Sequence, residues 1–215
     1  LKTKANKVSA SAVNTLIKNG ILNLEKEEVY RYQIKNQERE SAKVLNEEQQ
    51  SAKDKIIASL QKSEIFLLHG VTGSGKTEVY LSVIEEVLKL GKEAIVLVPE
   101  ISLTPQFVGV FSKRFPNDIA VLHSHLSDEE KYDEWRKILK GEVHICIGAR
   151  SASFAPFTNL GIIILDEEHS ESYKQESSPR YFALDVLKKR SQTHHCPLVL
   201  GCATPTLDSM AHAHK

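Results

Sequence analysis

One short stretch limits the folds open to this chain more than any other part of the sequence. Residues 70–77 read GVTGSGKT and match the phosphate-binding loop pattern G-x-x-x-x-G-K-[ST] at every fixed position. The apolar run 65–69 before them has strand length, and residues 77–90 after them place apolar side chains at helical spacing. A strand, a glycine-rich loop and a helix in this order predict a nucleotide-binding α/β domain.

The residue types in this loop fit phosphate binding. Glycines allow positive φ and let backbone N–H groups approach an anion, and the helix N-terminus adds unpaired donors and partial positive charge. Lys76 is expected to reach the β- and γ-phosphates of ATP, and the Thr77 hydroxyl to hold Mg²⁺. A glycine turn that binds nothing would leave this Lys-Thr pair unexplained. The predicted loop comprises Gly70, Val71, Thr72, Gly73, Ser74, Gly75, Lys76 and Thr77.

Composition narrows the class of protein. The 215 residues carry 28 Lys+Arg and 28 Asp+Glu, so any nucleic-acid contact must come from a local patch. The three cysteines (Cys146, Cys196 and Cys202) form no C-x-x-C pair, which favours buried thiols in a reducing cytoplasm. No apolar run approaches the ~20 residues of a membrane span. We expect a cytoplasmic globular protein, and the start without Met indicates part of a longer chain.

The N-terminal segment differs from the rest. Residues 7–18 place apolar side chains mostly at helical spacing, and Asn19-Gly20 is a helix stop. Two short segments follow, ILNL at 21–24 and EVYR at 28–31. A helix with a hairpin fits the closing half of a winged-helix module, and it fits equally well an amphipathic linker helix with a small β-ribbon. We assign residues 1–40 to the end of a winged-helix domain and its linker, and 41–215 to the ATP-binding domain.

Beyond residue 45, helical patterns alternate with apolar runs of strand length. The predicted strands are 65–69, 94–98, 119–122, 143–147, 162–165 and 198–200. The predicted helices between them are 77–90, 102–115, 127–140 and 182–190, and a Ser-Asp-Glu-Glu capping box opens the third. Strands this apolar predict an α/β fold with a mostly parallel sheet covered on both faces.

A second motif favours nucleotide hydrolysis. The apolar run 162–165 leads into Asp-Glu-Glu-His at 166–169, and ligands of open parallel sheets sit at the carboxyl ends of strands. Asp166 is expected to face the phosphate loop and hold Mg²⁺, and Glu167 to orient or deprotonate the attacking water. An acidic loop after a strand is common by itself. The chain lacks the L-S-G-G-Q motif of an ABC-type ATPase, and no acceptor site or lid arginines of a kinase are apparent.

Three motifs together resemble motifs I, II and III of superfamily 2 helicases: GVTGSGKT, DEEH and GCATPT at 201–206. Residues 70–80, 97–106 and 148–152 narrow the resemblance to the PriA family, DNA helicases that restart stalled replication forks. ESYKQE at 171–176 with Arg180-Tyr181 resembles that family's aromatic-rich loop. The resemblance covers about residues 45–209. It implies a RecA-like P-loop NTPase lobe of an ATP-dependent 3′-to-5′ helicase in replication restart and primosome assembly.

The resemblance also implies roles for residues outside the main motifs. Gln49 would pair with the adenine edge, and a local alternative is a helix capped by Asn46 with Gln49 at its third position. That capping does not exclude the adenine role. Thr104 and Gln106 would lie near the DNA backbone, although both also fit the start of a helix beside a proline. Arg150 would lie near DNA or in the coupling network, with a structural ion pair as the alternative.

The aromatic-rich loop and motif III complete the predicted DNA-contacting and coupling set. Aromatic faces stack on bases and cations contact phosphates, so this loop could report a bound single strand to the catalytic centre. The alternative is an ordinary solvated loop. Four loop residues carry the prediction: Tyr173, Lys174, Arg180 and Tyr181. His169 and motif III (Ala203, Thr204) would link nucleotide state to DNA state, unless His169 is a packed structural residue. Cys202 replaces the serine usual in the family's motif III.

The resemblance further implies cofactors and partners. ATP and Mg²⁺ are the expected cofactors, and zinc is expected in the full-length family but not in this fragment. The implied partners are single-stranded and forked DNA, primosome proteins and single-stranded DNA-binding protein, with no membrane. Two other functions stay open: a DNA-binding or primosome-assembly module without motor activity, and another superfamily 2 DNA translocase. Because no motif VI is visible, we expect this piece alone to have little or no helicase activity.

Overall fold

The computed structural model describes residues 10–23, 30–31 and 40–205. It falls into two compact units, Leu1–Tyr30 and Arg31–Lys215. In the first, helix α1 (Ala10–Lys18) ends where Gly20 takes a φ of 71° and the Ile21 N–H donates to the Leu16 carbonyl. The predicted helix and its stop are therefore confirmed. The predicted hairpin lies mostly outside the described residues, and the winged-helix assignment and the boundary at residue 40 stay predictions.

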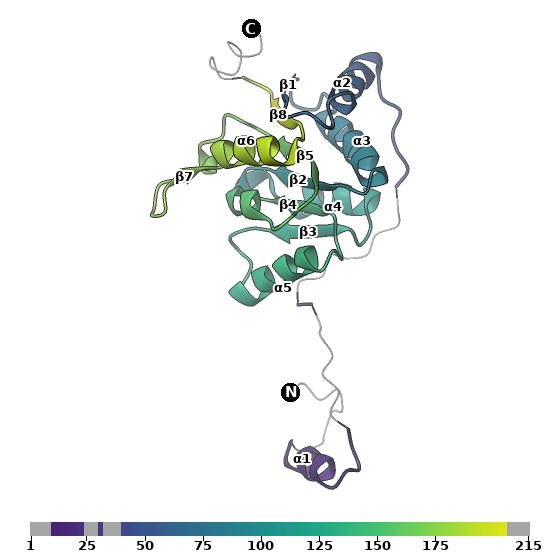
Figure 1. Ribbon diagram of the computed structural model, residues 1–215, viewed down its shortest axis with the longest axis vertical. Coiled ribbons are helices and arrows are strands. Elements are labelled where there is room, and N and C mark those ends of the chain that lie inside the picture. The colour runs from purple at the N-terminus through teal and green to yellow at the C-terminus, as the bar shows by residue number, and fades with distance from the viewer. Residues whose placement is uncertain (1–9, 24–29, 32–39, 206–215) are drawn as a thin grey trace. The chain divides into compact units, whose positions relative to one another are not determined.

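The second unit is built on a six-stranded parallel sheet in the order β1-β8-β5-β2-β4-β3 (Figure 1). The strands are β1 (Ile65–His69), β2 (Glu93–Leu97), β3 (Ile119–Leu122), β4 (Ile145–Gly148), β5 (Leu160–Leu165) and β8 (Leu198–Cys202). The prediction of a mostly parallel sheet is confirmed. Five of these strands are buried almost throughout because helices cover both faces, whereas β1 at one edge is only partly buried.

Helices cover the two faces of this sheet in two groups (Figure 1). One face carries α2 (Glu47–Ile57), α3 (Lys76–Lys89) and α4 (Pro105–Arg114), and the other carries α5 (Asp128–Leu139) and α6 (Ala183–His194). Successive strand residues serve opposite faces: Val96 packs under the first group and Ile95 under the second. No helix in the described ranges is long and apolar enough to cross a membrane.

Short elements fill the loops at the carboxyl ends of the strands. They are three 3₁₀ turns, η1 (Glu100–Ser102), η2 (Arg150–Phe154) and η3 (Glu171–Tyr173), and a small antiparallel hairpin, β6 (Lys174–Gln175) with β7 (Tyr181–Phe182). The predicted helix 102–115 begins later, at Pro105, because the Thr104 side chain caps it by accepting from the Phe107 N–H. Helix α6 runs past the predicted end at residue 190, because a polar last turn continues the helix without an apolar stripe.

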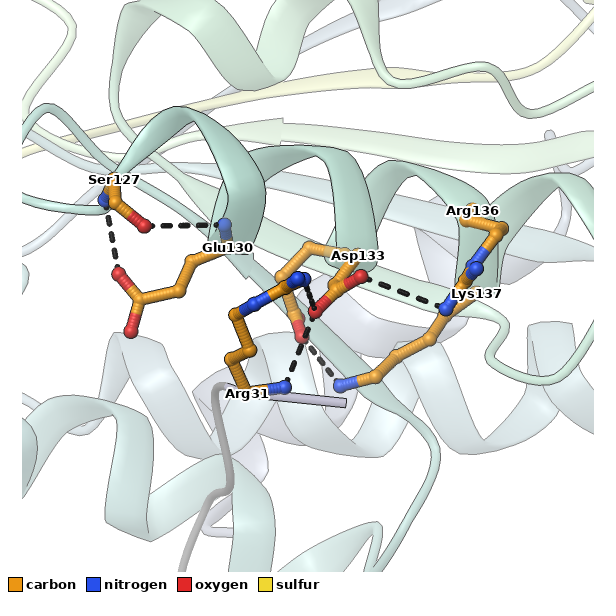
Figure 2. Close-up of polar contacts among 7 residues, drawn as sticks. Arg31, Ser127, Glu130, Asp133, Arg136 and Lys137 are labelled. Atoms are coloured by element: carbon orange, nitrogen blue, oxygen red, sulfur yellow. Dashed lines mark hydrogen bonds and ion pairs between the residues drawn. The ribbon is translucent and has the colours of Figure 1, made fainter. Parts of the chain in front are cut away.

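Helix α5 carries a row of polar contacts within itself and with Arg31 (Figure 2), and one further contact joins it to the edge strand β3. The predicted capping box is present, since the Ser127 hydroxyl accepts from the Glu130 N–H and the Glu130 carboxylate from the Ser127 N–H. Asp133 is 1% exposed and accepts from the backbone N–H and guanidinium of Arg31, at 3.2 and 2.9 Å. Glu134 is fully buried, with its carboxylate on the Val121 N–H of β3 at 2.8 Å and on the Lys137 ammonium.

Candidate active site

The order of the strands brings the predicted motifs together at one edge of the sheet. The phosphate loop follows β1, motif III follows β8, the Asp-Glu-Glu-His segment follows β5 and the 98–104 loop follows β2. These four strands are consecutive neighbours, and all point the same way. Segments more than 100 residues apart in the sequence therefore meet at the carboxyl ends of adjacent strands.

The phosphate loop is shaped by two glycines in the left-handed region. Gly73 has a φ of 82° and Gly75 of 84°, which residues with a side chain rarely adopt. Gly75 is the N-cap residue of α3, and no side chain caps this helix, so its first N–H groups remain available to an anion. The Lys76 ammonium donates to the Gly70 carbonyl at 2.5 Å, and the buried Ser74 hydroxyl has no hydrogen-bond partner in the described part of the chain. The cradle suits a phosphate group.

Gln49 takes part in the cap of helix α2 and also contacts the phosphate loop. Its side-chain oxygen accepts from the Asn46 N–H at 3.0 Å, and the Asn46 side chain accepts from the Gln49 N–H at 2.8 Å, so the capping box is present. Its amide nitrogen donates to the Ser74 carbonyl at 2.9 Å, a contact that sequence reasoning missed. The helix start is thereby fastened to the phosphate loop. The adenine contact of Gln49 stays a prediction.

Two tyrosines fix Asp166. The Tyr80 hydroxyl donates to Oδ1 of Asp166 at 2.9 Å, and the Tyr173 hydroxyl donates to the Asp166 carbonyl at 2.5 Å. Tyr80 is 1% exposed and Tyr173 is fully buried. Burial, and then the nearby Asp166 carboxylate, raise the pKa of both phenols well above the usual value. Both tyrosines are therefore neutral donors over the whole working pH range.

Glu167 has an unusual backbone that sets where its carboxylate lies. Its φ is 48°, a left-handed conformation that is uncommon for a residue with a side chain. Its Oε1 accepts from the Ser102 hydroxyl at 3.3 Å, across from the loop that follows β2. Strained backbone of this kind collects at functional sites. The sequence motif identified Glu167 but gave no sign of its Ser102 partner.

Motif III stands between the phosphate loop and the acidic segment. The Cys202 carbonyl accepts from the Gly70 N–H at 3.1 Å, and the Gly201 carbonyl from the Glu168 N–H at 3.0 Å. The His69 ring contacts the Ala203 carbonyl at 3.2 Å. Cys202 is buried, and burial raises the pKa of its thiol. The backbone of this strand is therefore hydrogen-bonded both to the phosphate loop and to the acidic segment.

The remaining motif residues are at the surface of the same edge. His169 and Thr204 are exposed in the loops after β5 and β8, and their coupling role stays a prediction. Thr104 and Gln106 line a cavity of about 560 Å³ together with Gln49 and Thr77. The predicted DNA-backbone residues thus share a hollow with two predicted nucleotide residues. Their contact with DNA stays a prediction.

Arg150 organises the aromatic-rich loop. Its guanidinium donates to the carbonyls of Ser172, at 3.3 Å, and Lys174, and it lies 5.9 Å from the centre of the Tyr181 ring. The sequence left open a structural ion pair for Arg150. Within the described residues its hydrogen-bond partners are backbone carbonyls instead. Tyr181 also meets the exposed ring of Phe154 edge-on, with centroids 5.0 Å apart. The Tyr181 ring and the Arg150 guanidinium together form a small aromatic platform.

The other residues of that loop divide into exposed and buried groups. Lys174 and Arg180 are exposed, and Tyr181 is partly exposed, so these three can reach a nucleic acid. Tyr173 is fully buried under Asp166 and presents no face for stacking on a base. The stacking part of the prediction for Tyr173 does not fit this burial, and its coupling role stays a prediction. The physical reason is that its hydroxyl finds an acceptor in the Asp166 carbonyl.

The donors at this edge fit Mg²⁺ held together with nucleotide phosphates. The Thr77 hydroxyl and the Asp166 carboxylate offer the hard oxygen ligands that Mg²⁺ prefers, and a nucleotide-bound Mg²⁺ keeps water and phosphate oxygens as its other ligands. No group of three His, Cys, Asp or Glu side chains that could hold a metal ion gathers within the described ranges. The arrangement suits a metal that arrives with its nucleotide.

Comparisons with known proteins agree with this geometry. The family of DEAD/DEAH box helicases matches residues 46–212. The replication restart protein PriA of Bacillus subtilis (strain 168) is 57% identical over 216 residues, which are 99% of this chain and 27% of that protein. PriA of Chlamydia pneumoniae is 49% identical over 216 residues, or 96% of this chain and 28% of that protein. The chain thus spans little more than a quarter of the length of these relatives.

Solved structures with the same fold are more distant in sequence. RecG bound to a three-way DNA junction matches with a TM-score of 0.56 and 22% identity, over 96% of this chain and 24% of that one. The UvsW helicase of bacteriophage T4 matches with a TM-score of 0.55 and 15% identity, over 94% of this chain and 73% of that one. These likenesses establish a RecA-like helicase fold for the sheet and its helices.

Proposed function

Since this chain belongs to the PriA family of DEAD/DEAH box helicases, we propose that it is the ATP-binding lobe of a DNA helicase that acts in replication restart. The observation that carries the proposal is the meeting of three motifs at the carboxyl ends of β1, β8 and β5. There a network of hydrogen bonds joins the phosphate loop and the acidic segment to β8, through Gly70 and Glu168, and Tyr80 of α3 holds Asp166. Such a network suits ATP hydrolysis better than simple nucleotide storage.

The residues of the lobe divide the work of hydrolysis. The uncapped α3 N-terminus and loop N–H groups bind the phosphates, and Lys76 exchanges its carbonyl partner Gly70 for phosphate oxygens. Glu167 orients the attacking water in line with the γ-phosphate. Thr77 and Asp166 would hold Mg²⁺ bound with ATP, and the ion would supply positive charge that neutralises the phosphates. The single lobe holds one side of this site, and a second lobe in the full-length protein completes it.

DNA coupling is the second half of the proposal. We assign contact with single-stranded or forked DNA to Thr104, Gln106 and the platform of Arg150 and Tyr181. Exposed cations attract phosphates, and an aromatic face stacks on a base without regard to sequence. His169 and Thr204 pass the state of the strand to the nucleotide. Movement in the 3′-to-5′ direction, and assembly with primosome proteins and single-stranded DNA-binding protein, belong to the same proposal.

A titration with a fluorescent ATP analogue and Mg²⁺ tests the site. The chain should show saturable binding, and Lys76→Ala should weaken it about 30- to 100-fold, because a charged hydrogen-bond donor to phosphate is removed. Lys89→Ala is the matched control, since Lys89 lies exposed at the far end of the same helix in a surface pair with Glu86. Equal binding by Lys76→Ala and Lys89→Ala would contradict the site.

A further inference from the structure

We propose that Tyr80 is a positioning residue that holds the Asp166 carboxylate in the orientation needed to meet the metal of a bound Mg²⁺–nucleotide. The inference rests on the proposed function, because it concerns the metal side of the same site. The Tyr80 hydroxyl lies 2.9 Å from Oδ1 of Asp166, and its ring is 1% exposed. A phenol fixed by burial on every side can hold its partner in one rotamer.

The contact leaves the second carboxylate oxygen for a ligand. Tyr80 takes Oδ1, and within the described ranges no hydrogen bond reaches Oδ2 of Asp166. Backbone contacts fix the base of the side chain as well, because the Asp166 N–H donates to the Leu97 carbonyl at 2.9 Å and its carbonyl accepts from Tyr173. Asp166 is only half-buried, so the free oxygen can face the nucleotide.

Helix α3 ties both ends of the metal site to one rigid element. Thr77 and Tyr80 are three residues apart on α3, so their side chains leave the same face of the helix. Thr77 is the proposed hydroxyl ligand, and Tyr80 sets the carboxylate opposite it. The distance between the two metal-facing groups is therefore governed by one turn of one helix, even though Asp166 itself lies in the loop after β5.

Gly201 provides the space in which this contact forms. A Cβ added at Gly201 would lie 1.8 Å from the Tyr80 hydroxyl oxygen and 2.6 Å from Oδ1 of Asp166. No side chain fits there while the hydrogen bond is present. Gly201 stands on β8, between the strands that carry the phosphate loop and Asp166. A glycine at the start of motif III thus has a steric reason that is specific to this tyrosine and carboxylate pair.

The test compares two tyrosines that donate to the same residue. Tyr80→Phe removes the bond to the Asp166 side chain, and Tyr173→Phe removes the bond to its carbonyl. In the full-length protein, binding of a fluorescent ATP analogue is titrated with Mg²⁺, and Mn²⁺ bound with the nucleotide is measured by electron paramagnetic resonance. We expect Tyr80→Phe to raise the half-saturating Mg²⁺ and Mn²⁺ concentrations about tenfold, the effect of one hydrogen bond to a charged group. Tyr173→Phe removes only the contact with the Asp166 carbonyl and keeps the contact with its side chain, so its shift should be smaller than that of Tyr80→Phe.

Other outcomes overturn the inference in distinguishable ways. If Tyr80→Phe and the wild type need the same metal concentration, Tyr80 does not position Asp166, and the proposed function stands. If both phenylalanine variants shift equally, the effect is general loosening of the core, and the positioning role fails. Wild-type binding that ignores Mg²⁺ would overturn the inference and the metal part of the proposed function together.

Gly201→Ala is a second variant for the case in which Tyr80→Phe does not fold. The added methyl group separates the Tyr80 hydroxyl from Asp166 and leaves both side chains intact. It should raise the metal requirement in the same direction as Tyr80→Phe. An unchanged metal requirement in folded Gly201→Ala would count against the inference.

Discussion

Two regions of the molecule concentrate acidic side chains: the carboxyl ends of β1, β8 and β5, and helix α5 beside β3. The two regions differ in the kind of group that contacts these carboxylates. On α5, cations of the same chain meet the carboxylates: Arg31 and Arg136 on Asp133, and Lys137 on Glu134. At the nucleotide edge, the side-chain partners within the described residues are neutral hydroxyls, Tyr80 on Asp166 and Ser102 on Glu167. Acidic groups that meet internal cations are tied to the fold, whereas acidic groups held by neutral donors remain available to an external cation.

The largest effect is expected from a change to an acidic residue at the nucleotide edge. Glu167→Gln keeps the size of the side chain but removes the carboxylate that orients water. ATP hydrolysis by the full-length protein should fall about 10²- to 10³-fold, while nucleotide affinity changes little. The thermal midpoint should stay within a degree or two of wild type, since no cation in the described part of the chain pairs with this carboxylate. Glu129→Gln, at an exposed position, is the control. Retained hydrolysis by Glu167→Gln would remove Glu167 from the mechanism.

The next effect tests the structural side. Glu134→Ala leaves the buried Val121 N–H and the Lys137 ammonium without their acceptor. Unfolding in urea should show a loss of about 2–4 kcal/mol, the cost of orphaning buried partners. Glu134→Gln keeps an acceptor for Val121 and should lose much less. Nucleotide affinity should be the same in both folded variants. Equal stability of the two variants would mean that the buried contact contributes nothing.

The smallest effects follow pH and differ in sign between neighbours. Burial alone would raise the pKa of Asp133, but the hydrogen bonds and charge of Arg31 lower it below its usual value. Its stabilising contribution is present above the unfolded pKa of about 3.9 and is lost as pH falls through the lower folded pKa. The loss in free energy of unfolding caused by Asp133→Asn, measured in urea, should therefore become smaller as the pH falls toward the folded pKa of Asp133. Arg31→Ala should cost less than about 1 kcal/mol at pH 7, since Arg31 is half exposed.

Glu134 provides the opposite sign on the same helix. Burial raises the pKa of Glu134 despite the Lys137 ammonium and the Val121 N–H. Its contribution is fully present below the unfolded pKa of about 4.3 and is lost as pH rises through the raised folded pKa. Glu134→Gln should gain on the wild type as pH rises from about 4 to 7. The free energy of unfolding of each variant, relative to wild type, is measured against pH. The same trend with pH for Asp133→Asn and Glu134→Gln would contradict the opposite pKa shifts of the two carboxylates.

The spacing of apolar residues predicted most helices and strands of the α/β domain, because apolar runs and helical periodicity are clear in this part of the sequence. Residues 65–69 and 119–122 were predicted as strands with the observed bounds, since apolar runs end where polar loops begin. The motifs likewise predicted the places of two residues along the chain: Lys76 stands at the start of the helix after β1, and Asp166 directly follows β5. Boundaries failed where a side chain decides them, as Thr104 does at the start of α4.

Partners across the fold could not be read from the sequence. Helix α5 is rich in charge along its whole length, and nothing in its spacing marks Asp133 and Glu134 as buried. Their burial depends on Arg31, about 100 residues away, and on a backbone N–H of β3. Tyr173 is a related case, because an aromatic residue in a polar loop predicts exposure until its acceptor, the Asp166 carbonyl in the loop after β5, is known.

The Glu134 contact has a further consequence for how copies of this protein behave in a crowded solution. Strand β3 is the outermost strand of its sheet, and an open strand edge is a template on which another chain can add and aggregate. The buried Glu134 carboxylate occupies the Val121 N–H that such a strand would need. Helix α5 thus removes one hydrogen-bonding position from the edge strand, at the end of the sheet farthest from the phosphate loop.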